Sequence, residues 1–318
     1  MSIIPIFFTV DEGYAPYLDC AIRSMVDNAS KDNEYVIHVL HQNLTDESVE
    51  KIKTGVKAPF SIEFIKMEDE FHGIVAREEN KLRCDYFTLT IYFRIFIADM
   101  FPQYDKGIYI DSDIIVPGDI SELYNTDLEG NIIGACCDRS IQGVPDLVFY
   151  TENAVGTASD DYINSGILLM DLKLMRDRHF SEHFLNLMNE YHFDTIAPDQ
   201  DYINAMCNGN IKYLSDDWDT MPPQGGEVKL NPNPKLIHFN LFQKPWCYDN
   251  IPYEDYFWKY VEMSPFKNDI LDFKANYDES KQKADSDTLM KLISKAAVLD
   301  KNEVTFKKMY DNGVKIRI

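Results

Sequence analysis

The chain of 318 residues has few basic residues, no C-x-x-C pair of cysteines and no long apolar run. It holds 31 Lys or Arg against 53 Asp or Glu, a formal net charge of −22. Nucleic-acid binding draws most of its affinity from Lys and Arg that neutralise phosphates, so this balance argues against a nucleic-acid partner. No uncharged apolar stretch approaches the roughly eighteen residues that a membrane-spanning helix needs. The six cysteines include no C-x-x-C pair, which predicts reduced and mostly buried thiols.

The first ten residues are apolar but lack the basic segment of a signal peptide. Asp11 and Glu12 follow where a cleavage site would need small residues, so we expect a first strand and a cytoplasmic protein. Hydrophobic residues make up 45% of the chain and aromatic residues 13%, enough for a sizeable core. The length favours one large domain, or one domain with an appendage.

Short runs rich in Ile, Val and Phe alternate with helix-length segments. This alternation predicts an α/β fold with a mainly parallel sheet covered on both faces. The expected strands are 3–10, 35–40, 61–66, 107–110, 131–136 and 163–170, and the expected helices are 14–28, 46–54 and 87–100. The stretches 138–160 and 216–234 lack either pattern, so we expect two long irregular loops that form walls of a substrate site.

The character of the chain changes near residue 273. We divide it into a main domain, 1–272, and a helical C-terminal extension, 273–318. Residues 281–318 include nine basic and five acidic residues, a net charge of +4, which leaves −26 for the rest. We expect the extension to pack on the main domain. The alternative is a weakly cationic surface that makes peripheral contact with anionic lipid at the inner face of a membrane.

Asp111-Ser112-Asp113 follows the apolar run 107–110 and is the strongest local signal. Two carboxylates this close repel each other unless a cation lies between them, and a hard divalent ion with oxygen ligands suits them. Open α/β sheets also bind their ligands at the carboxyl ends of strands. The motif therefore predicts a metal site, with a solvated turn as the alternative.

His238 and Lys244 lie beyond a second apolar stretch. A histidine beside apolar neighbours is often a core residue, but its imidazole could complete a carboxylate metal site, and the lysine could meet a phosphate. Mixed carboxylate and imidazole ligation favours manganese, with magnesium as the second choice.

Three further polar groups lie in apolar surroundings. Arg94, inside an expected buried helix, is either a structural ion-pair partner or part of a functional cleft. Asn164-Ser165-Gly166 precedes an apolar strand, where the glycine allows a bend or the close approach of a ligand. The acidic residues of Asp199-Gln200-Asp201 suit the start of a helix, but that explanation does not account for Gln200.

Taken in order, these motifs resemble those of glycosyltransferase family 8, in particular the bacterial lipopolysaccharide galactosyl- and glucosyltransferases, with glycogenin as a more distant relative. The matching positions run from residue 7 to residue 246. The resemblance implies a GT-A fold: a Rossmann-like, mainly parallel mixed sheet flanked by helices. It also implies a retaining, manganese-dependent transfer of galactose or glucose from a UDP-sugar to a hydroxyl of a glycan, glycoprotein or glycolipid acceptor, as in cell-surface polysaccharide biosynthesis.

The resemblance further implies the roles of individual residues. The metal would be held by Asp111, Asp113 and His238. The nucleotide would be bound by Thr9, Val10, Asp11, Tyr14, Ser112 and Lys244. The donor sugar would be bound by Arg94, Asp138, Asn164, Ser165 and the backbone around Gly166, and the residues nearest the anomeric carbon would be Asp199 and Gln200. The chain departs from the galactosyltransferases at Asn240-Leu241-Phe242, where they have a glycine shortly after the metal histidine.

Gln200 carries an amide, which is a poor nucleophile. We therefore expect the acceptor hydroxyl to attack from the face that UDP leaves, with Asp199 as a covalent nucleophile as the alternative. Two other classes compete with this function. A metal-dependent nucleotidyltransferase would need a basic phosphate loop where this chain has Asp11-Glu12-Gly13. A non-catalytic nucleotide-sugar or carbohydrate-binding protein would not need Arg94 or the paired carboxylates.

Overall fold

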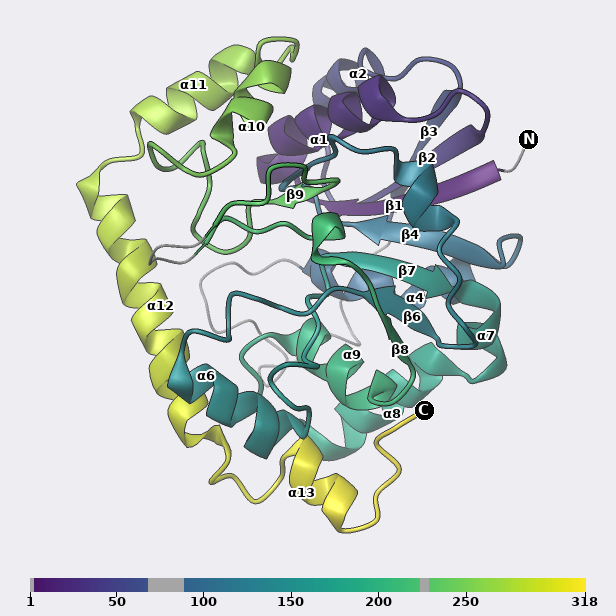
Figure 1. Ribbon diagram of the computed structural model, residues 1–318, viewed down its shortest axis with the longest axis vertical. Helices are drawn as coiled ribbons and strands as arrows, with labels where there is room; N and C mark the ends of the chain where they lie inside the picture. The colour runs from purple at the N-terminus through teal and green to yellow at the C-terminus, as the bar shows by residue number, and fades with distance from the viewer. Residues whose placement is uncertain (1–2, 68–88, 224–228) are drawn as a thin grey trace. The chain divides into compact units, whose positions relative to one another are not determined.

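The computed structural model describes residues 3–67, 89–223 and 229–318 (Figure 1). The chain forms two compact units, each built from segments far apart in the sequence. The first unit consists of Met1–Met67, Gly107–Asp127 and Ser215–Asp285, and the second of Glu68–Lys106, Leu128–Leu214 and Ser286–Ile318.

In its described residues, the first unit contains four parallel strands in the order β3, β2, β1, β4. Their bounds are β1 (Ile3–Val10), β2 (Glu34–His41), β3 (Phe60–Lys66) and β4 (Lys106–Ile110). Ile6, Ile37 and Ile108, one from each of three strands, are fully buried. This burial matches the near-continuous apolar runs that strands covered on both faces require.

Helices and a small second sheet complete the first unit. α1 (Ala15–Asn28) contacts α2 (Asp46–Lys53), α10 (Glu254–Val261) and α11 (Lys267–Ala275), and Figure 1 shows α1 and α2 beside β1–β3. β5 (Ile114–Ile115) pairs antiparallel with β9 (Ile237–His238). Short elements flank these: η1 (Glu12–Tyr14), α5 (Ile120–Tyr124) and η5 (Asp216–Trp218).

The described part of the second unit contains three strands. β6 (Ile133–Ala135) runs antiparallel to β7 (Ile167–Asp171) and parallel to β8 (Ile211–Tyr213). Before β6 in the chain come η3 (Leu89–Tyr92) and α4 (Phe93–Met100). Between β6 and β8 lie α6 (Pro145–Tyr150), the π-helix η4 (Thr151–Val155), α7 (Leu172–Asp177), α8 (Phe180–Tyr191) and α9 (Pro198–Cys207).

The end of the chain is helical and packs on α9. It contains α12 (Glu279–Leu299) and α13 (Phe306–Asp311). Phe306 stacks on Phe193 with ring centroids 3.9 Å apart and meets Tyr202 of α9 edge to face. The N–H of Ile318 donates to the carbonyl of Met206, 3.0 Å away. The C-terminal segment therefore packs against α9. The domain division at residue 273 stays a prediction.

The seven strands with flanking helices confirm the expected α/β class, and every expected strand is present. The last begins at Ile167 rather than 163; Ile163 forms only an isolated antiparallel bridge with Cys137, and the side chain of Asn204 bonds both of its backbone groups. Phe87 and Thr88, at the start of one expected helix, lie outside the described residues. None of the helices in the described ranges is long and apolar enough to cross a membrane.

The expectation of an irregular loop over 138–160 is wrong. α6 begins at Pro145 and continues into the π-helix, and together they bury Leu147, Tyr150 and Val155. A helix of six residues is too short to show a clear 3.6-residue pattern in the sequence. The stretch 216–234 has the short η5 and is otherwise irregular in its described part, and Gly225-Gly226 falls outside the described residues.

Gly118 is expected to be essential for the approach of the chain to β9. A Cβ added to it would lie 2.9 Å from the Cβ and 3.0 Å from the Cα of Lys235, and the Gly118 N–H donates to the Lys235 carbonyl. Because backbone must shift, we expect Gly118→Ala to destabilise the protein by about 1–3 kcal/mol. Gly143→Ala, with no described atom within 4 Å of the new carbon, is the control. Equal midpoints of urea unfolding for the two variants would contradict this expectation.

Candidate active site

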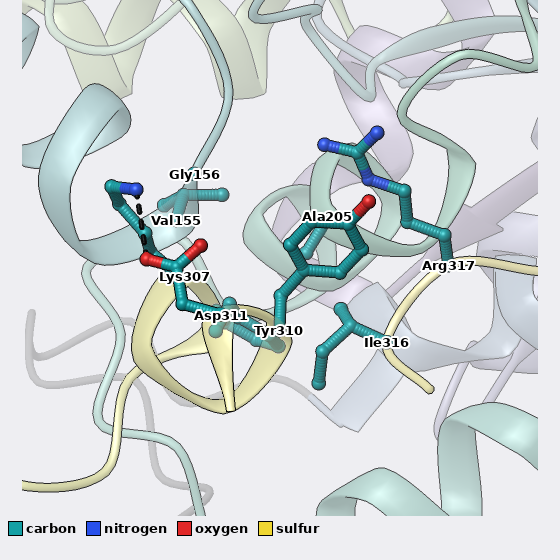
Figure 2. A pocket seen from close by; sticks show the side chains of 9 residues that line it. Val155, Gly156, Ala205, Lys307, Tyr310, Asp311, Ile316 and Arg317 are labelled. Atoms are coloured by element: carbon teal, nitrogen blue, oxygen red, sulfur yellow. Dashed lines mark hydrogen bonds and ion pairs between the residues drawn. The ribbon is translucent and has the colours of Figure 1, made fainter. Parts of the chain in front are cut away.

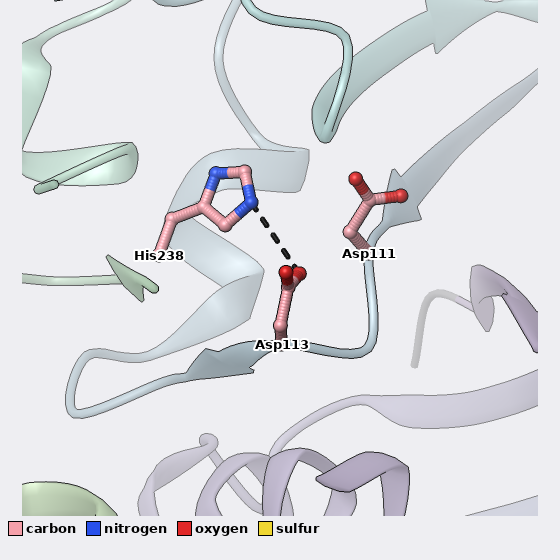
Figure 3. Close-up of side chains that lie close together, drawn as sticks. All are labelled: Asp111, Asp113 and His238. Carbon is pink, nitrogen blue, oxygen red and sulfur yellow. Dashed lines mark ion pairs between the residues drawn. The ribbon is translucent and has the colours of Figure 1, made fainter. Parts of the chain in front are cut away.

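Asp111, Asp113 and His238 form one cluster in the first unit (Figure 3). One possible ligand atom from each lies within 4.8 Å of the others. The Nε2 atom of His238 is 3.4 Å from Oδ1 of Asp113. The two carboxylates follow the end of β4, and the pairing of β5 with β9 sets His238 opposite Ile114, next to Asp113. A two-residue ladder thus joins residues that are distant in the sequence.

Two neighbours orient this cluster. The hydroxyl of Tyr109 donates to Oδ1 of Asp111 at 2.5 Å. Oδ1 of the buried Asp219 lies 2.9 Å from Nδ1 of His238, and because a carboxylate only accepts, Nδ1 carries the proton and Nε2 faces Asp113. Neither residue was among those predicted from the sequence. Tyr109 could have been found, since it points to the same side of its strand as Asp111; nothing in the sequence marks Asp219.

Charge balance inside the cluster comes from Lys244 and His238. Nζ of Lys244 lies 2.5 Å from Oδ2 of Asp113. Burial acts to raise the pKa of Asp113, but Lys244 and His238 outweigh it and hold the pKa well below its usual range. Burial also acts to lower the pKa of His238, yet Asp219 and Asp113 raise it to about 10. A histidine binds a metal only as a neutral imidazole, so an ion would displace the Nε2 proton of His238; two carboxylates and that imidazole then form a donor set that fits Mn²⁺ or Mg²⁺.

The predicted nucleotide-binding residues lie around this cluster. Thr9 Oγ1 is 2.8 Å from the Tyr109 hydroxyl, and its carbonyl accepts a 3.4 Å hydrogen bond from Ser112. Asp11 caps η1 by accepting from the N–H of Tyr14. Val10 is a buried residue of β1, so its side chain belongs to the core.

The segment that departs from the family pattern keeps a glycine-like backbone. Leu241 has φ +53°, in the left-handed region that favours glycine. The Asn240 side chain accepts a 2.7 Å hydrogen bond from the Leu241 N–H and so supports this conformation. The chain therefore keeps a left-handed backbone conformation at Leu241 although this residue is bulkier than glycine.

A second polar cluster is buried in the second unit and contains Arg94, Asp138, Asn164, Ser165, Asp199 and Gln200, each at most 9% exposed. Asp199 and Gln200 lie in the first turn of α9, and Asn164 and Ser165 come just before β7. Arg94 Nε is 3.2 Å from Oδ2 of Asp199, and its Nη1 donates to the Ser165 carbonyl at 2.6 Å. The arginine is thus an ion-pair partner that also joins the predicted sugar-binding residues.

Both ends of the Gln200 amide are fixed. Its Nε2 donates to Oδ2 of Asp138 at 2.9 Å, and its Oε1 accepts from the N–H of Ser165 at 3.0 Å. Asp138 also accepts from Asn164 at 3.2 Å and from the N–H of Ser140 at 2.9 Å. The amide orientation is therefore set by its surroundings, as a positioned polar group requires.

Asp201 anchors the start of α9 and was not among the predicted site residues. It accepts hydrogen bonds from the hydroxyls of Tyr162 at 2.6 Å and Tyr150 at 2.8 Å, and from the backbone N–H of Ala197 at 3.0 Å. Its side chain is fully buried, and burial outweighs these hydrogen bonds and raises its pKa to about 6.

A pocket in the second unit is lined by residues other than those of the two polar clusters. Figure 2 shows the Arg317 guanidinium beside the Tyr310 ring, 4.3 Å from its centroid, and the ion pair of Lys307 with Asp311. Val155, Gly156 and Ala205 also line it. Among the described residues that line this pocket, none belongs to the predicted site.

The model of glycosyl transferase family 8 matches residues 5–250. This chain belongs to glycosyl transferase family 8. Three further proteins are similar to it in sequence. General stress protein A of Bacillus subtilis is 24% identical over 282 residues, 83% of this chain and 94% of that protein. The lipopolysaccharide 1,2-glucosyltransferase of Escherichia coli K12 is 28% identical over 230 residues, 62% of this chain and 64% of that protein. A Haemophilus influenzae relative is 26% identical over 227 residues, 70% of this chain and 65% of that protein.

This family 8 chain thus spans slightly less than two thirds of the Haemophilus and Escherichia relatives. Among solved structures it is similar to the galactosyltransferase LgtC in complex with donor and acceptor sugar analogues, with a TM-score of 0.69 and 23% identity over 82% of this chain and 96% of LgtC. It is also similar to the bifunctional glycosyltransferase WbbM, with a TM-score of 0.71 and 21% identity over 85% of this chain and 51% of WbbM. These similarities confirm the GT-A fold.

Asp201 predicts a pH dependence of stability. A carboxyl group whose pKa is raised by folding, here from 3.8 to about 6, stabilises the fold below its unfolded pKa and loses that contribution as pH rises through the folded value. Asp201→Asn does not titrate, so between pH 4 and 7 the wild type should lose up to about 3 kcal/mol of stability relative to this variant.

Urea unfolding of both proteins across this pH range measures the difference. Asp146→Asn, which removes an exposed carboxylate of α6, is the control and should follow the wild type at every pH. A difference between wild type and Asp201→Asn that stays constant with pH would refute the assignment.

Proposed function

We propose that this family 8 member is a retaining hexosyltransferase, which moves galactose or glucose from a UDP-sugar to a hydroxyl of a glycan, glycoprotein or glycolipid in the cytoplasm. The observation that carries the proposal is the cluster of Asp111, Asp113 and His238, with Lys244 beside it. Two similar proteins support it: one is a lipopolysaccharide 1,2-glucosyltransferase, and the other is a galactosyltransferase whose structure holds donor and acceptor sugar analogues.

Asp111, Asp113 and His238 would hold Mn²⁺, with Mg²⁺ as the alternative. When bound, such an ion supplies positive charge beside the diphosphate, where negative charge develops as UDP departs. We assign the second positive charge to Lys244. Around the same cluster, the uridine would be bound by Thr9, Val10, Asp11 and Tyr14, and Ser112 would face the ribose.

The polar cluster of the second unit would bind the donor sugar through Arg94, Asp138, Asn164, Ser165 and the backbone around Gly166. Asp199 and Gln200 are our candidates for the positions nearest the anomeric carbon. Oδ2 of Asp199 is bonded by the Arg94 guanidinium and by the Ser165 hydroxyl at 3.0 Å, which makes this carboxylate a poor nucleophile.

We therefore favour attack by the acceptor hydroxyl on the face that UDP leaves. The bond from the acceptor oxygen to the anomeric carbon forms as the bond from that carbon to the β-phosphate oxygen breaks. The acceptor proton passes to the departing phosphate. Gln200, with its amide fixed at both ends, would position and stabilise the sugar as positive charge develops. One LgtC structure is of an active-site variant in which a glutamine is replaced by glutamate, which supports a glutamine in such a place.

Loss of either carboxylate of the metal site is expected to abolish activity. We expect Asp111→Asn and Asp113→Asn to lower UDP release from UDP-galactose or UDP-glucose with Mn²⁺ by at least about a hundredfold. Asp32→Asn makes the same charge change at an exposed position of the first unit and should keep full activity. Normal turnover by either site variant in buffer treated with a chelator would show that the metal assignment is wrong.

Gln200 is expected to act on turnover more than on donor binding. Gln200→Ala should lower kcat roughly a hundredfold, with a much smaller change in the Kd of the UDP-sugar, because its amide matters most as charge develops. Gln103→Ala, at an exposed position of the second unit, is the matched control. An unchanged kcat with weakened UDP-sugar binding would show that Gln200 only positions the bound UDP-sugar before it reacts.

A further inference from the structure

Lys244 and the proposed metal share a carboxylate. Nζ of Lys244 lies 2.5 Å from Oδ2 of Asp113 and 2.8 Å from the carbonyl oxygen of Phe239. The other oxygen of Asp113, Oδ1, lies 3.4 Å from Nε2 of His238. Both oxygens of this candidate metal ligand are therefore already engaged by side chains of the protein.

Surrounding side chains hold the ammonium of Lys244 in place. Its Nζ lies 5.8 Å from the centroid of the Tyr14 ring and 5.3 Å from that of Trp246, within the range of cation–π attraction. Trp246 stacks in turn on Tyr17, with centroids 3.9 Å apart. The Lys244 side chain is only 12% exposed, unlike the flexible partners of an ordinary surface ion pair.

A divalent ion bound by Asp113 would have to lie close to this ammonium, and the two positive charges would repel each other in a poorly solvated place. A diphosphate changes the balance, because its oxygens offer the ammonium an alternative anionic partner. Without the nucleotide, the lysine and the metal compete for one carboxylate. With the nucleotide, each has anionic oxygens of its own.

We propose that Lys244 competes with the divalent cation for Asp113 in the nucleotide-free protein. When UDP binds, the ammonium of Lys244 pairs with the diphosphate instead, so that Lys244 couples metal binding to nucleotide binding. This inference rests on the metal site proposed above. Because such coupling is reciprocal, Mn²⁺ must raise the affinity for UDP by the same factor as UDP raises the affinity for Mn²⁺. The lysine would disfavour metal uptake before the nucleotide arrives.

The test is the binding of Mn²⁺ to the full chain, followed by electron paramagnetic resonance, with calorimetric titration of UDP in the presence and absence of Mn²⁺. In the absence of UDP, Lys244→Met should bind Mn²⁺ about tenfold more tightly than the wild type, and the gain in UDP affinity caused by Mn²⁺ should shrink by a similar factor. Lys244→Arg keeps the charge and should retain the coupling. Lys235→Met, which removes a lysine paired with Glu122 instead, should behave as the wild type.

A merely structural role for Lys244 predicts the opposite sign, since a loosened site would bind Mn²⁺ more weakly with or without UDP. Unchanged or weaker Mn²⁺ binding by nucleotide-free Lys244→Met would therefore overturn the proposed competition but leave the metal site standing. If Lys244→Met does not fold, Lys244→Gln takes its place in this test. Loss of Mn²⁺ binding in Asp113→Asn supports the metal site independently of the lysine. A wild type that binds no Mn²⁺ with or without UDP would overturn both proposals.

Discussion

The repulsion between two carboxylates at the end of one strand is the constraint on which the first unit depends. Asp111 and Asp113 are separated by one residue, and both belong to the cluster that includes His238. Negative charges this close need positive charge or hydrogen-bond donors nearby. The protein supplies a lysine ammonium, an imidazole and a tyrosine hydroxyl, all from side chains held by neighbouring secondary structure. An acidic chain thereby gains a local place that suits a cation and, through it, a phosphate.

Very little secondary structure brings the neutralising groups to these carboxylates. The ladder between β5 and β9 has two residues on each side, yet it fixes His238 against Asp113. The N–H of Val116 donates to the Ser24 hydroxyl of α1, and the N–H of Gly118 donates to the carbonyl of Lys235. The first contact ties the ladder to α1, and the second ties the segment after β5 to the segment before β9. The precision of the cluster therefore comes from the surrounding core rather than from the short strands themselves.

The sequence was most informative where chemistry and burial conflict. Asp111 and Asp113 after an apolar strand, and Arg94 within an apolar helix, stood out because burying charge is costly, and the structure places both groups in polar clusters. It was least informative where the conflict is resolved by a distant partner. Asp219 and Tyr150 look ordinary in the sequence, and only the folded chain shows that they hold His238 and Asp201. The short α6 escaped for another reason, since six residues carry too little periodicity.

The discontinuous make-up of the first unit has a consequence during protein synthesis. Strands β1–β5 and the paired carboxylates emerge from the ribosome well before Ser215–Asp285, the segment that brings β9 with His238, and Lys244. Until then a nascent chain carries two adjacent negative charges without the imidazole and ammonium that neutralise them in the finished fold. Completion of the cluster is thus a late event in biogenesis, and a chain that stops before residue 238 has no means of assembling it.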